Sequence, residues 1–265
     1  MTPEQQQIAA AKRIGVNRPI DEVLALLRAL LDFDTVMAGK RKKAGCAIPI
    51  AIAVIIAGFV TSGMVPYGIV IPILGIVAAI AAIVFFVRFK SQDLSDNLRT
   101  AAVPFLAVLR EDMNASDALH VNIDLRPYTI DEKKKKESDP YKKGAYYKII
   151  DKLFVDPWFD GSAVLADGTK VRWNVVEHVL QHHKTKRTSR GKIKSKLKVS
   201  RKTVAVVTLA FPMKEYAVTG DAERDEKRAT MTLAKKLKTK DENSPAFGLL
   251  VDLIADGYRR VKASA

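Results

Sequence analysis

The sequence predicts a membrane-anchored α+β protein: a two-helix transmembrane hairpin joined to a small antiparallel β-rich cytoplasmic domain that ends in a C-terminal helix. Three patterns predict it: a long apolar run without charges, alternating apolar residues after residue 118, and a helical apolar period near the end of the chain. With 265 residues, 44 Lys+Arg and 29 Asp+Glu, the chain is long enough for a core and carries a net charge of +15.

Residues 44–88 form the predicted hairpin. Between residues 44 and 87 the only ionisable side chains are those of Cys46 and Tyr67. A helix needs about 20 apolar residues to cross the hydrocarbon core, and this run provides two such spans, expected at 45–62 and 69–88. The run is too long, and begins too far along the chain, for the apolar part of a cleaved signal peptide. The sequence therefore predicts an integral membrane protein.

The charges that flank the run predict its orientation. Lys40, Arg41, Lys42 and Lys43 precede the first span and Arg88 and Lys90 follow the second, whereas the loop between the spans has no charge. By the positive-inside rule both termini are cytoplasmic, and we expect the cell (inner) membrane. The single cysteine then lies at the cytoplasmic membrane edge and has no partner for a disulfide.

Small residues recur at four-residue spacing in both spans. Such residues allow helix backbones to approach closely in lipid. Two interpretations remain open: the spans pack on each other, or a small-residue face is left over for an identical neighbour in a homo-oligomer. The pairs are Ala47 with Ala51, Ala53 with Ala57, Gly75 with Ala79, and Ala78 with Ala82.

Helices are also expected on both sides of the hairpin. Residues 1–43 are predicted to be a cytoplasmic region with an amphipathic helix, and residues 89–115 a juxtamembrane helix. Each has one apolar face, and something must cover it. These faces are formed by Ile20, Val23, Leu24, Leu27, Leu30 and Leu31, and by Leu94, Leu98, Ala101, Ala102, Phe105 and Leu109.

Residues 116–265 are predicted to be a basic β-rich cytoplasmic domain. It starts with a half-buried strand whose inward residues are Leu119, Val121, Ile123 and Leu125. Asp167-Gly168 indicates a two-residue hairpin turn with both φ angles positive, which places Val164 opposite Val171. Residues 145–155 fit both the strand and the helix period.

A C-terminal helix is expected at 244–262, with Ser244 as its cap and Pro245 in its first turn. Its expected sheet-packing face consists of Phe247, Leu250, Val251, Ile254, Tyr258 and Val261.

A long hairpin at 169–211 carries the main functional signal. Lysine occupies every second position from Lys192 to Lys198. If Gly191 takes the left-handed conformation in a three-residue turn, Thr188 faces Lys192. The facing pairs are then His178 with Lys202, His182 with Lys198, Lys184 with Lys196, and Lys186 with Lys194. The other face carries Val175, Val179, Leu197, Val199, Ala205 and Val207.

This ladder has no counter-charge in the sequence around it. No Asp or Glu occurs between His178 and Lys214, and facing like charges destabilise a sheet by a few tenths to about 1 kcal/mol per pair. We therefore expect an external anion; in the other interpretation the lysines only discourage edge pairing. The expected anion- or partner-binding residues are Lys184, Lys186, Arg187, Arg190, Lys192, Lys194, Lys196, Lys198 and Lys202.

The first hypothesis for function is a membrane-anchored, non-enzymatic interaction protein whose basic ribbon contacts anionic lipid or an acidic protein partner at the cytoplasmic face. One alternative is membrane-tethered nucleic-acid binding, although residues 174–210 contain no aromatic side chain for stacking. Another is a self-assembling subunit of a membrane complex.

The sequence shows no clear catalytic or cofactor signature. His178 and His182 lack a zinc-binding context, and Asp156 and Asp160 flank Trp158 in what is more often a turn than an acid/base pair. No phosphate loop or nucleophile motif is present, so no cofactor is predicted and an enzyme is not indicated. An enzyme would call for a concave pocket that joins His120, Asp156 or His178.

Overall fold

The computed structural model describes residues 2–61, 69–218, 222–239 and 244–263. The fold is α+β, with an antiparallel sheet and two long apolar helices, as the sequence predicts. The chain divides into two compact units. Residues 1–10 and 28–94 form a helical unit, and residues 11–27 and 95–265 form a sheet unit.

The helical unit holds the two apolar helices. Short helix α1 (Pro3–Ala11) precedes α2 (Ile20–Thr61) and α3 (Val70–Ser91) along the chain. By length and composition, α2 and α3 are both able to cross a membrane. Only 11% of the most apolar window of α2 and 17% of that of α3 are buried. The core helix of a soluble protein would be mostly buried, so these helices present apolar surface that the described residues leave uncovered.

Helices α2 and α3 contact each other through small residues. A Cβ atom added to Gly75 would lie 2.7 Å from Ile55 Cγ1, and one added to Gly58 would lie 2.6 Å from Pro72 Cδ. Ala51 and Ala82 are buried. The two apolar helices therefore pack on each other, as the first of the two interpretations predicts. The predicted spans lie within α2 and α3 except at residues 62 and 69, of which 62 is outside the described residues.

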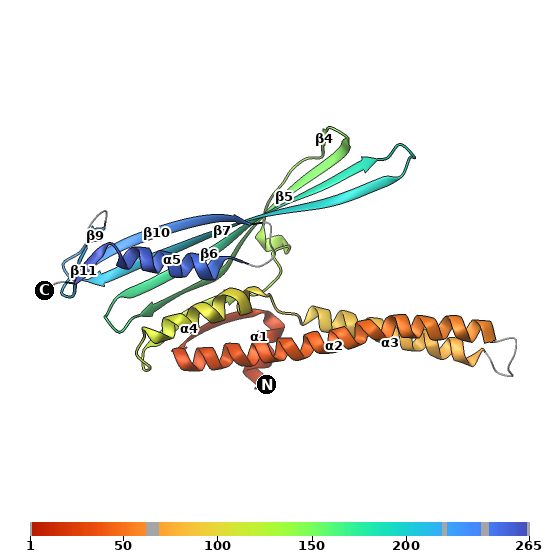
Figure 1. Ribbon diagram of the computed structural model, residues 1–265, viewed down its shortest axis with the longest axis horizontal. Helices are drawn as coiled ribbons and strands as arrows, with labels where there is room; N and C mark the ends of the chain where they lie inside the picture. Colours follow the sequence, from red (N-terminus) through yellow and green to blue (C-terminus); the bar gives the residue numbers. More distant parts are fainter. Residues whose placement is uncertain (1, 62–68, 219–221, 240–243, 264–265) are drawn as a thin grey trace. The chain divides into compact units, whose positions relative to one another are not determined.

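The sheet unit is built on an antiparallel sheet of order β1-β2-β5-β6-β7-β10-β9, with β3 and β4 also paired to β5 (Figure 1). The strands are β1 (Arg13–Pro19), β2 (Ala118–Asp124), β3 (Lys134–Glu137), β4 (Tyr141–Lys143), β5 (Tyr146–Val164), β6 (Lys170–Arg187), β7 (Ile193–Pro212), β9 (Glu223–Arg224) and β10 (Arg228–Thr239). A separate pair joins β8 (Tyr216–Val218) to β11 (Val261–Ala263).

One face of the sheet, here the covered face, packs against helices. These are the π-helical turn η1 (Leu98–Ala102) with α4 (Val103–Glu111), and α5 (Ala246–Tyr258). Phe105 of α4 makes edge contacts with Phe159 and Trp173, with ring centroids 5.8 and 5.2 Å away. The opposite face is here called the open face. The predicted inward residues Leu119, Val121, Ile123 and Leu125 are all buried.

The chain before the apolar helices differs from the single helix expected in residues 1–43. β1 lies between α1 and α2, and it pairs with β2 over its whole length. This strand has only seven residues, most of them polar or exposed, so its own pattern is weak; pairing with β2 stabilises it. The predicted apolar face at Ile20, Val23, Leu24 and Leu27 is buried.

The segment 89–115 is also not one helix. α3 ends at Ser91, and η1 begins at Leu98 and continues into α4. The expected apolar face nevertheless holds, because Leu98, Ala101, Ala102, Phe105 and Leu109 are buried. The ambiguous segment 145–155 is strand from residue 146 onward, where β5 begins.

The turn at Asp167-Gly168 is not the two-residue turn that we expected. Gly168 has φ +77°, but Asp167 does not have a positive φ. The loop holds three residues, so Leu165 faces Thr169 and Val171 pairs with Ala163 rather than Val164. The Asp167 carboxylate accepts the Thr169 N–H at 2.8 Å and the hydroxyls of Thr169, Tyr216 and Tyr258. Burial alone would raise the pKa of Asp167, but these bonds together hold it below its usual value.

The C-terminal helix packs on the sheet, as expected, but with a different face and cap. Pro245 occupies the cap position, and the buried Ser244 Oγ has no hydrogen-bond partner among the described residues. The prediction of Ser244 as the cap is therefore wrong. A Cβ atom on Gly257 would lie 2.1 Å from Leu209 Cδ1, so glycine lets the helix come close there. The buried face is Ala246, Leu249, Leu250, Leu253 and Gly257.

Candidate functional site

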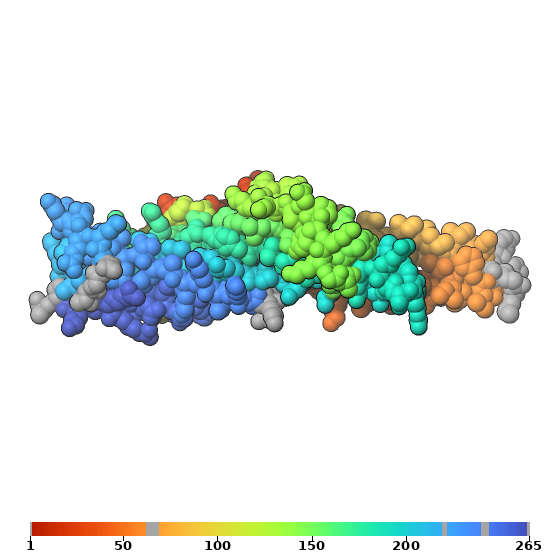
Figure 2. Space-filling view, turned by 90° about the horizontal axis from the view of Figure 1, so that it is seen from above, coloured from red at the N-terminus to blue at the C-terminus, as the bar shows by residue number. Residues whose placement is uncertain are grey.

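Beyond the helices that cover the sheet, β5, β6 and β7 continue as a three-stranded extension, here the basic ribbon (residues 146–155, 178–187 and 193–202 with the turn between β6 and β7). Figure 1 shows its tip reaching past α5, with β4 beside it. Figure 2 shows the green segment around residues 130–145 next to the cyan β6–β7 tip. The hairpin predicted at 169–211 thus has its root on the domain and its tip exposed.

The predicted register of the long hairpin is confirmed. Gly191 has φ +76°, and the Thr188 N–H donates to the Lys192 carbonyl at 2.9 Å. A three-residue turn with its last residue left-handed fixes which residues face each other along both strands. The four facing pairs are His178 with Lys202, His182 with Lys198, Lys184 with Lys196, and Lys186 with Lys194.

The third strand of the ribbon, β5, brings a carboxylate that the local sequence lacks. Asp151 faces His182, and its Oδ1 lies 2.6 Å from His182 Nδ1. The Tyr141 hydroxyl donates to Asp151 Oδ2 at 3.0 Å. Both oxygens of Asp151 are therefore engaged by groups other than lysine.

The lysines of β6 and β7 in the ribbon have no carboxylate partner among the described residues. Among the described residues, Lys184, Lys186, Lys194, Lys196 and Lys198 form no ion pair within 4.0 Å. Lys184 Nζ lies 5.6 Å from the centroid of the Tyr146 ring, a cation–π contact that leaves the charge in place. Two lysine pairs thus face each other without compensation.

The other predicted site residues do not all share this face. Lys202 lies on it and faces His178 on β6 and Lys238 on β10. Arg187 belongs to the opposite face by alternation and donates to the Gly191 carbonyl at 3.4 Å. Arg190 lies in the turn, and Lys192 follows it. Lys238 is a cation that the sequence analysis missed, because the segment before it did not reveal its strand.

The underside of the ribbon is apolar but uncovered at the tip. Ile193 and Leu197 are 64% and 50% exposed, whereas Val175 and Val179 on the same face nearer the root are fully buried. The predicted apolar face is therefore only partly apolar, because Gln181, Thr185 and Arg201 also lie on it. At the tip of the β6–β7 hairpin, lysines are exposed on one side and Ile193 and Leu197 on the other.

The residues of the suggested catalytic pocket do not meet. Trp158 is the extra residue of a β-bulge, and Pro157 stands beside it, where a missing N–H is tolerated. The bulge puts Asp156 on the covered face with Glu177 and puts Asp160 on the open face with Asn174. These two carboxylates therefore do not form an acid/base pair.

Asp156 belongs to a buried charged cluster. Its Oδ1 lies 2.7 Å from Lys133 Nζ, which also approaches Asp124 at 3.3 Å and donates to the Arg126 carbonyl. Burial raises the pKa of Asp156 to about 6, and Lys133 opposes that rise. The cluster fastens the segment before β3 to the sheet.

The histidines also point to separate places. His178 faces Lys202 on the basic ribbon, and His120 lines a depression on the open face at the root. His178 and His182 lie on a strand beside lysines, and the described residues contain no group of three His, Cys, Asp or Glu side chains placed to hold a metal ion.

Comparison with known proteins adds no relative to this picture: no protein-family model, no curated protein and no solved structure matches the chain. The class of protein therefore follows from its own structure. It is an α+β chain with an antiparallel sheet, a basic ribbon and two helices that are apolar enough to cross a membrane.

Proposed function

We propose that this chain is a membrane-anchored, non-enzymatic interaction protein whose basic ribbon contacts anionic phospholipid headgroups. α2 and α3 span the cell membrane in this proposal. The basic residues 40–43, Arg88 and Lys90 keep both termini in the cytoplasm, because the loop between the spans carries no charge. The sheet unit then faces the anionic cytoplasmic leaflet.

The observation that supports the proposal is that two pairs of lysines face each other without a neighbouring carboxylate. These pairs are Lys184 with Lys196 and Lys186 with Lys194. Each facing pair costs a few tenths to about 1 kcal/mol, which an external anion would remove. A lysine near an anionic leaflet contributes about 1 kcal/mol, and the attraction falls off within about 8 Å. A tethered ribbon samples the surface at high effective concentration, so such weak contacts suffice.

The exposed apolar underside is consistent with the same partner. Ile193 and Leu197 are free of protein contacts that would bury them, and an exposed apolar group next to cations suits the boundary between headgroups and acyl chains. An acidic protein offers the same charge, and the aromatic-poor ribbon is less suited to single-stranded nucleic acid. Anionic lipid is therefore the partner that both faces of the tip favour.

The test uses the full chain, reconstituted in phosphatidylcholine vesicles with or without phosphatidylserine. Cys46 is the single cysteine, so a Cys46→Ser, Ser189→Cys chain carries one environment-sensitive fluorophore in the exposed turn of the ribbon. We expect the emission to shift only in vesicles that contain phosphatidylserine, and the shift to disappear as salt is added.

Two triple variants separate the ribbon from net charge. Lys186, Lys194 and Lys196 changed to Ser should abolish the shift. Lys214, Lys227 and Lys262 changed to Ser remove the same charge from exposed positions elsewhere and should preserve it. A shift of equal size in neutral vesicles, or one that survives in the ribbon variant, would contradict the proposal. If RNA or polyglutamate bound with the same lysine dependence while vesicles did not, that partner would replace lipid.

A further inference from the structure

The open face at the root of the sheet carries a straight row of polar side chains. The strand register places one residue from each of six neighbouring strands directly opposite the next, and all six are polar. In strand order from β1 to β10 the row is Asn17, His120, Ser162, Arg172, Thr208 and Thr232. Facing residues of antiparallel strands point to the same side, so these side chains share one surface.

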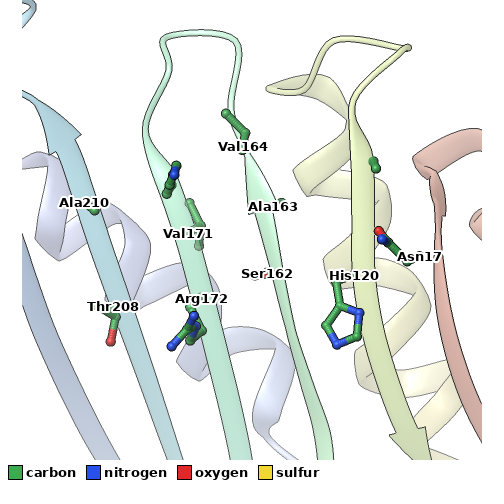
Figure 3. A pocket seen from close by; sticks show the side chains of 11 residues that line it. Asn17, His120, Ser162, Ala163, Val164, Val171, Arg172, Thr208 and Ala210 are labelled. Carbon is green, nitrogen blue, oxygen red and sulfur yellow. The ribbon is translucent and has the colours of Figure 1, made fainter. Parts of the chain in front are cut away.

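This row crosses a depression of about 520 Å³ (Figure 3). Figure 3 shows Asn17, His120, Arg172 and Thr208 on four strands, with the helices behind the sheet. The next row on the same face is formed partly by small side chains, Ala118 and Ala210, with Lys170 between β5 and β7. A hollow of this size accommodates a small metabolite.

The side chains of this row can all donate hydrogen bonds, and none of them is a carboxylate. Arg172 is exposed and, among the described residues, forms no ion pair and no hydrogen bond with another side chain. Its neighbours in the row offer the hydroxyls of Ser162 and Thr208, and Lys170 adds a second cation two residues away. Asp160, the carboxylate of the adjacent row, already accepts from Asn122 Nδ2 at 3.1 Å. The depression is therefore positively charged and rich in donors.

We propose that this depression binds a small phosphate monoester, with its phosphate on Arg172. A guanidinium fork flanked by hydroxyls matches the tetrahedral oxygens of a phosphate, and arginine binds such groups in a bidentate manner. Adjacent strands are about 4.8 Å apart, so His120 and Asn17 lie about 10 and 15 Å along the row from Arg172. A small ester with its phosphate on Arg172 would therefore contact Ser162 and Thr208 and would not reach Asn17. The site shares no residue with the basic ribbon and does not depend on its proposed function.

The test is a titration of the full chain, in micelles of a neutral detergent, with glycerol 3-phosphate, followed by broadening of the ³¹P resonance. We expect saturable binding by the wild-type chain. Arg172→Gln should weaken it at least tenfold, and Arg172→Lys, which keeps the charge but loses the fork, should fall between the two. Ser162→Ala should weaken it severalfold. Circular dichroism and thermal melting check that each variant is folded.

The matched control is Arg28→Gln, which removes an exposed arginine of α2 that belongs neither to the depression nor to the basic ribbon and should leave the affinity unchanged. Equal binding by wild type and Arg172→Gln, equal loss in Arg28→Gln, or no saturable binding of any phosphate monoester would overturn the proposal.

A second arm distinguishes the source of the phosphate. Micelles doped with phosphatidic acid are compared with micelles doped with phosphatidylcholine. Competition with glycerol 3-phosphate by phosphatidic acid alone, with the same dependence on Arg172, assigns the site to a lipid headgroup. Binding of glycerol 3-phosphate that phosphatidic acid does not displace assigns it to a soluble ester.

Discussion

The same three strands, β5, β6 and β7, form both the root and the tip of the sheet unit, and the two regions differ in what covers them. At the root, Leu209 is fully buried beneath α5, against Gly257. At the tip, Leu197 of the same strand and the same face is 50% exposed. Along β7 the alternation of the two faces runs from one region to the other, although Arg201 and Thr203 interrupt the apolar face between them.

This difference shows that alternating residues in a strand predict which side chains share a face, but not whether that face is buried. At the root the open face carries neutral polar residues and isolated cations, whereas at the tip it carries facing lysines. The root is stabilised by packing on the covered face. At the tip, Ile193 and Leu197 of the β6–β7 hairpin are exposed, and the hairpin retains the facing lysine pairs that weaken it. A region that keeps destabilising charges without structural compensation is a candidate for binding.

The largest expected effect is a difference in stability between two leucine-to-alanine changes in β7, one at the root and one at the tip. Leu209→Ala leaves a cavity beneath α5 and should lower the free energy of unfolding by about 2–5 kcal/mol. Leu197→Ala should change it by less than about 0.5 kcal/mol, because the side chain is half exposed. Denaturant titration of the full chain, followed by the fluorescence of Trp158 and Trp173, measures both. Similar losses would show that the tip is covered.

A smaller effect depends on pH and concerns the buried cluster at the root. The pKa of Asp156 is raised to about 6 in the folded chain, from an ordinary value of 3.8. The folded state therefore binds this proton more tightly than the unfolded state, so the contribution of Asp156 to stability is present at low pH and is lost as pH rises through about 6.

Asp156→Asn removes this titration and leaves Lys133 with Asp124 and the Arg126 carbonyl. Between pH 5 and pH 7 the wild type should lose about 1 kcal/mol of stability relative to the variant. Unfolding curves of both chains at the two pH values provide the comparison. Parallel pH dependence of the two chains would rule out a raised pKa at this site.

The smallest effect sharpens the contrast at the tip. Lys196→Glu places opposite charges at a facing pair with Lys184. It should stabilise the ribbon by a few tenths to about 1 kcal/mol while weakening its binding to anionic vesicles. Lys196→Ser serves as the neutral control, and hydrogen exchange of the β6–β7 amides reports local stability. A variant that gains stability and binds anionic vesicles as well as the wild type would separate the ladder from binding.

Sequence patterns predicted the elements that are determined by residues close together in the chain. Gly191 fixed the turn, so the lysine register followed from counting along two strands. The turn at Asp167 escaped because its carboxylate is held by Thr169, Tyr216 and Tyr258, two of which are distant in sequence. The buried face of α5 was misplaced because it includes Gly257, which apolar periodicity ignores and which lets the helix lie close to Leu209.

Tertiary pairing explains the remaining differences. β1 was not predicted because its pairing with β2, and not its own residue pattern, stabilises it as a strand. The start of β5 was ambiguous because its apolar residues fit both the strand and the helix period. These residues are Tyr146, Ile149, Ile150 and Leu153. The ladder lysines could be predicted from their spacing alone. Lys238 and Asp151 lie beside the ladder only because β10 pairs with β7 and β5 pairs with β6, and the sequence did not predict these pairings. The row of polar residues that contains Arg172 was not predicted for the same reason, because it depends on the register of six strands.

The most direct measurement of the central claim is the rate of acetylation of individual lysines, read by mass spectrometry, in the full chain reconstituted in neutral and in anionic vesicles. If the ladder contacts lipid headgroups, Lys186, Lys194 and Lys196 should be protected severalfold in anionic vesicles alone, and Lys214 and Lys227 should react equally in both. Equal reactivity of the ladder lysines in the two membranes would contradict the account.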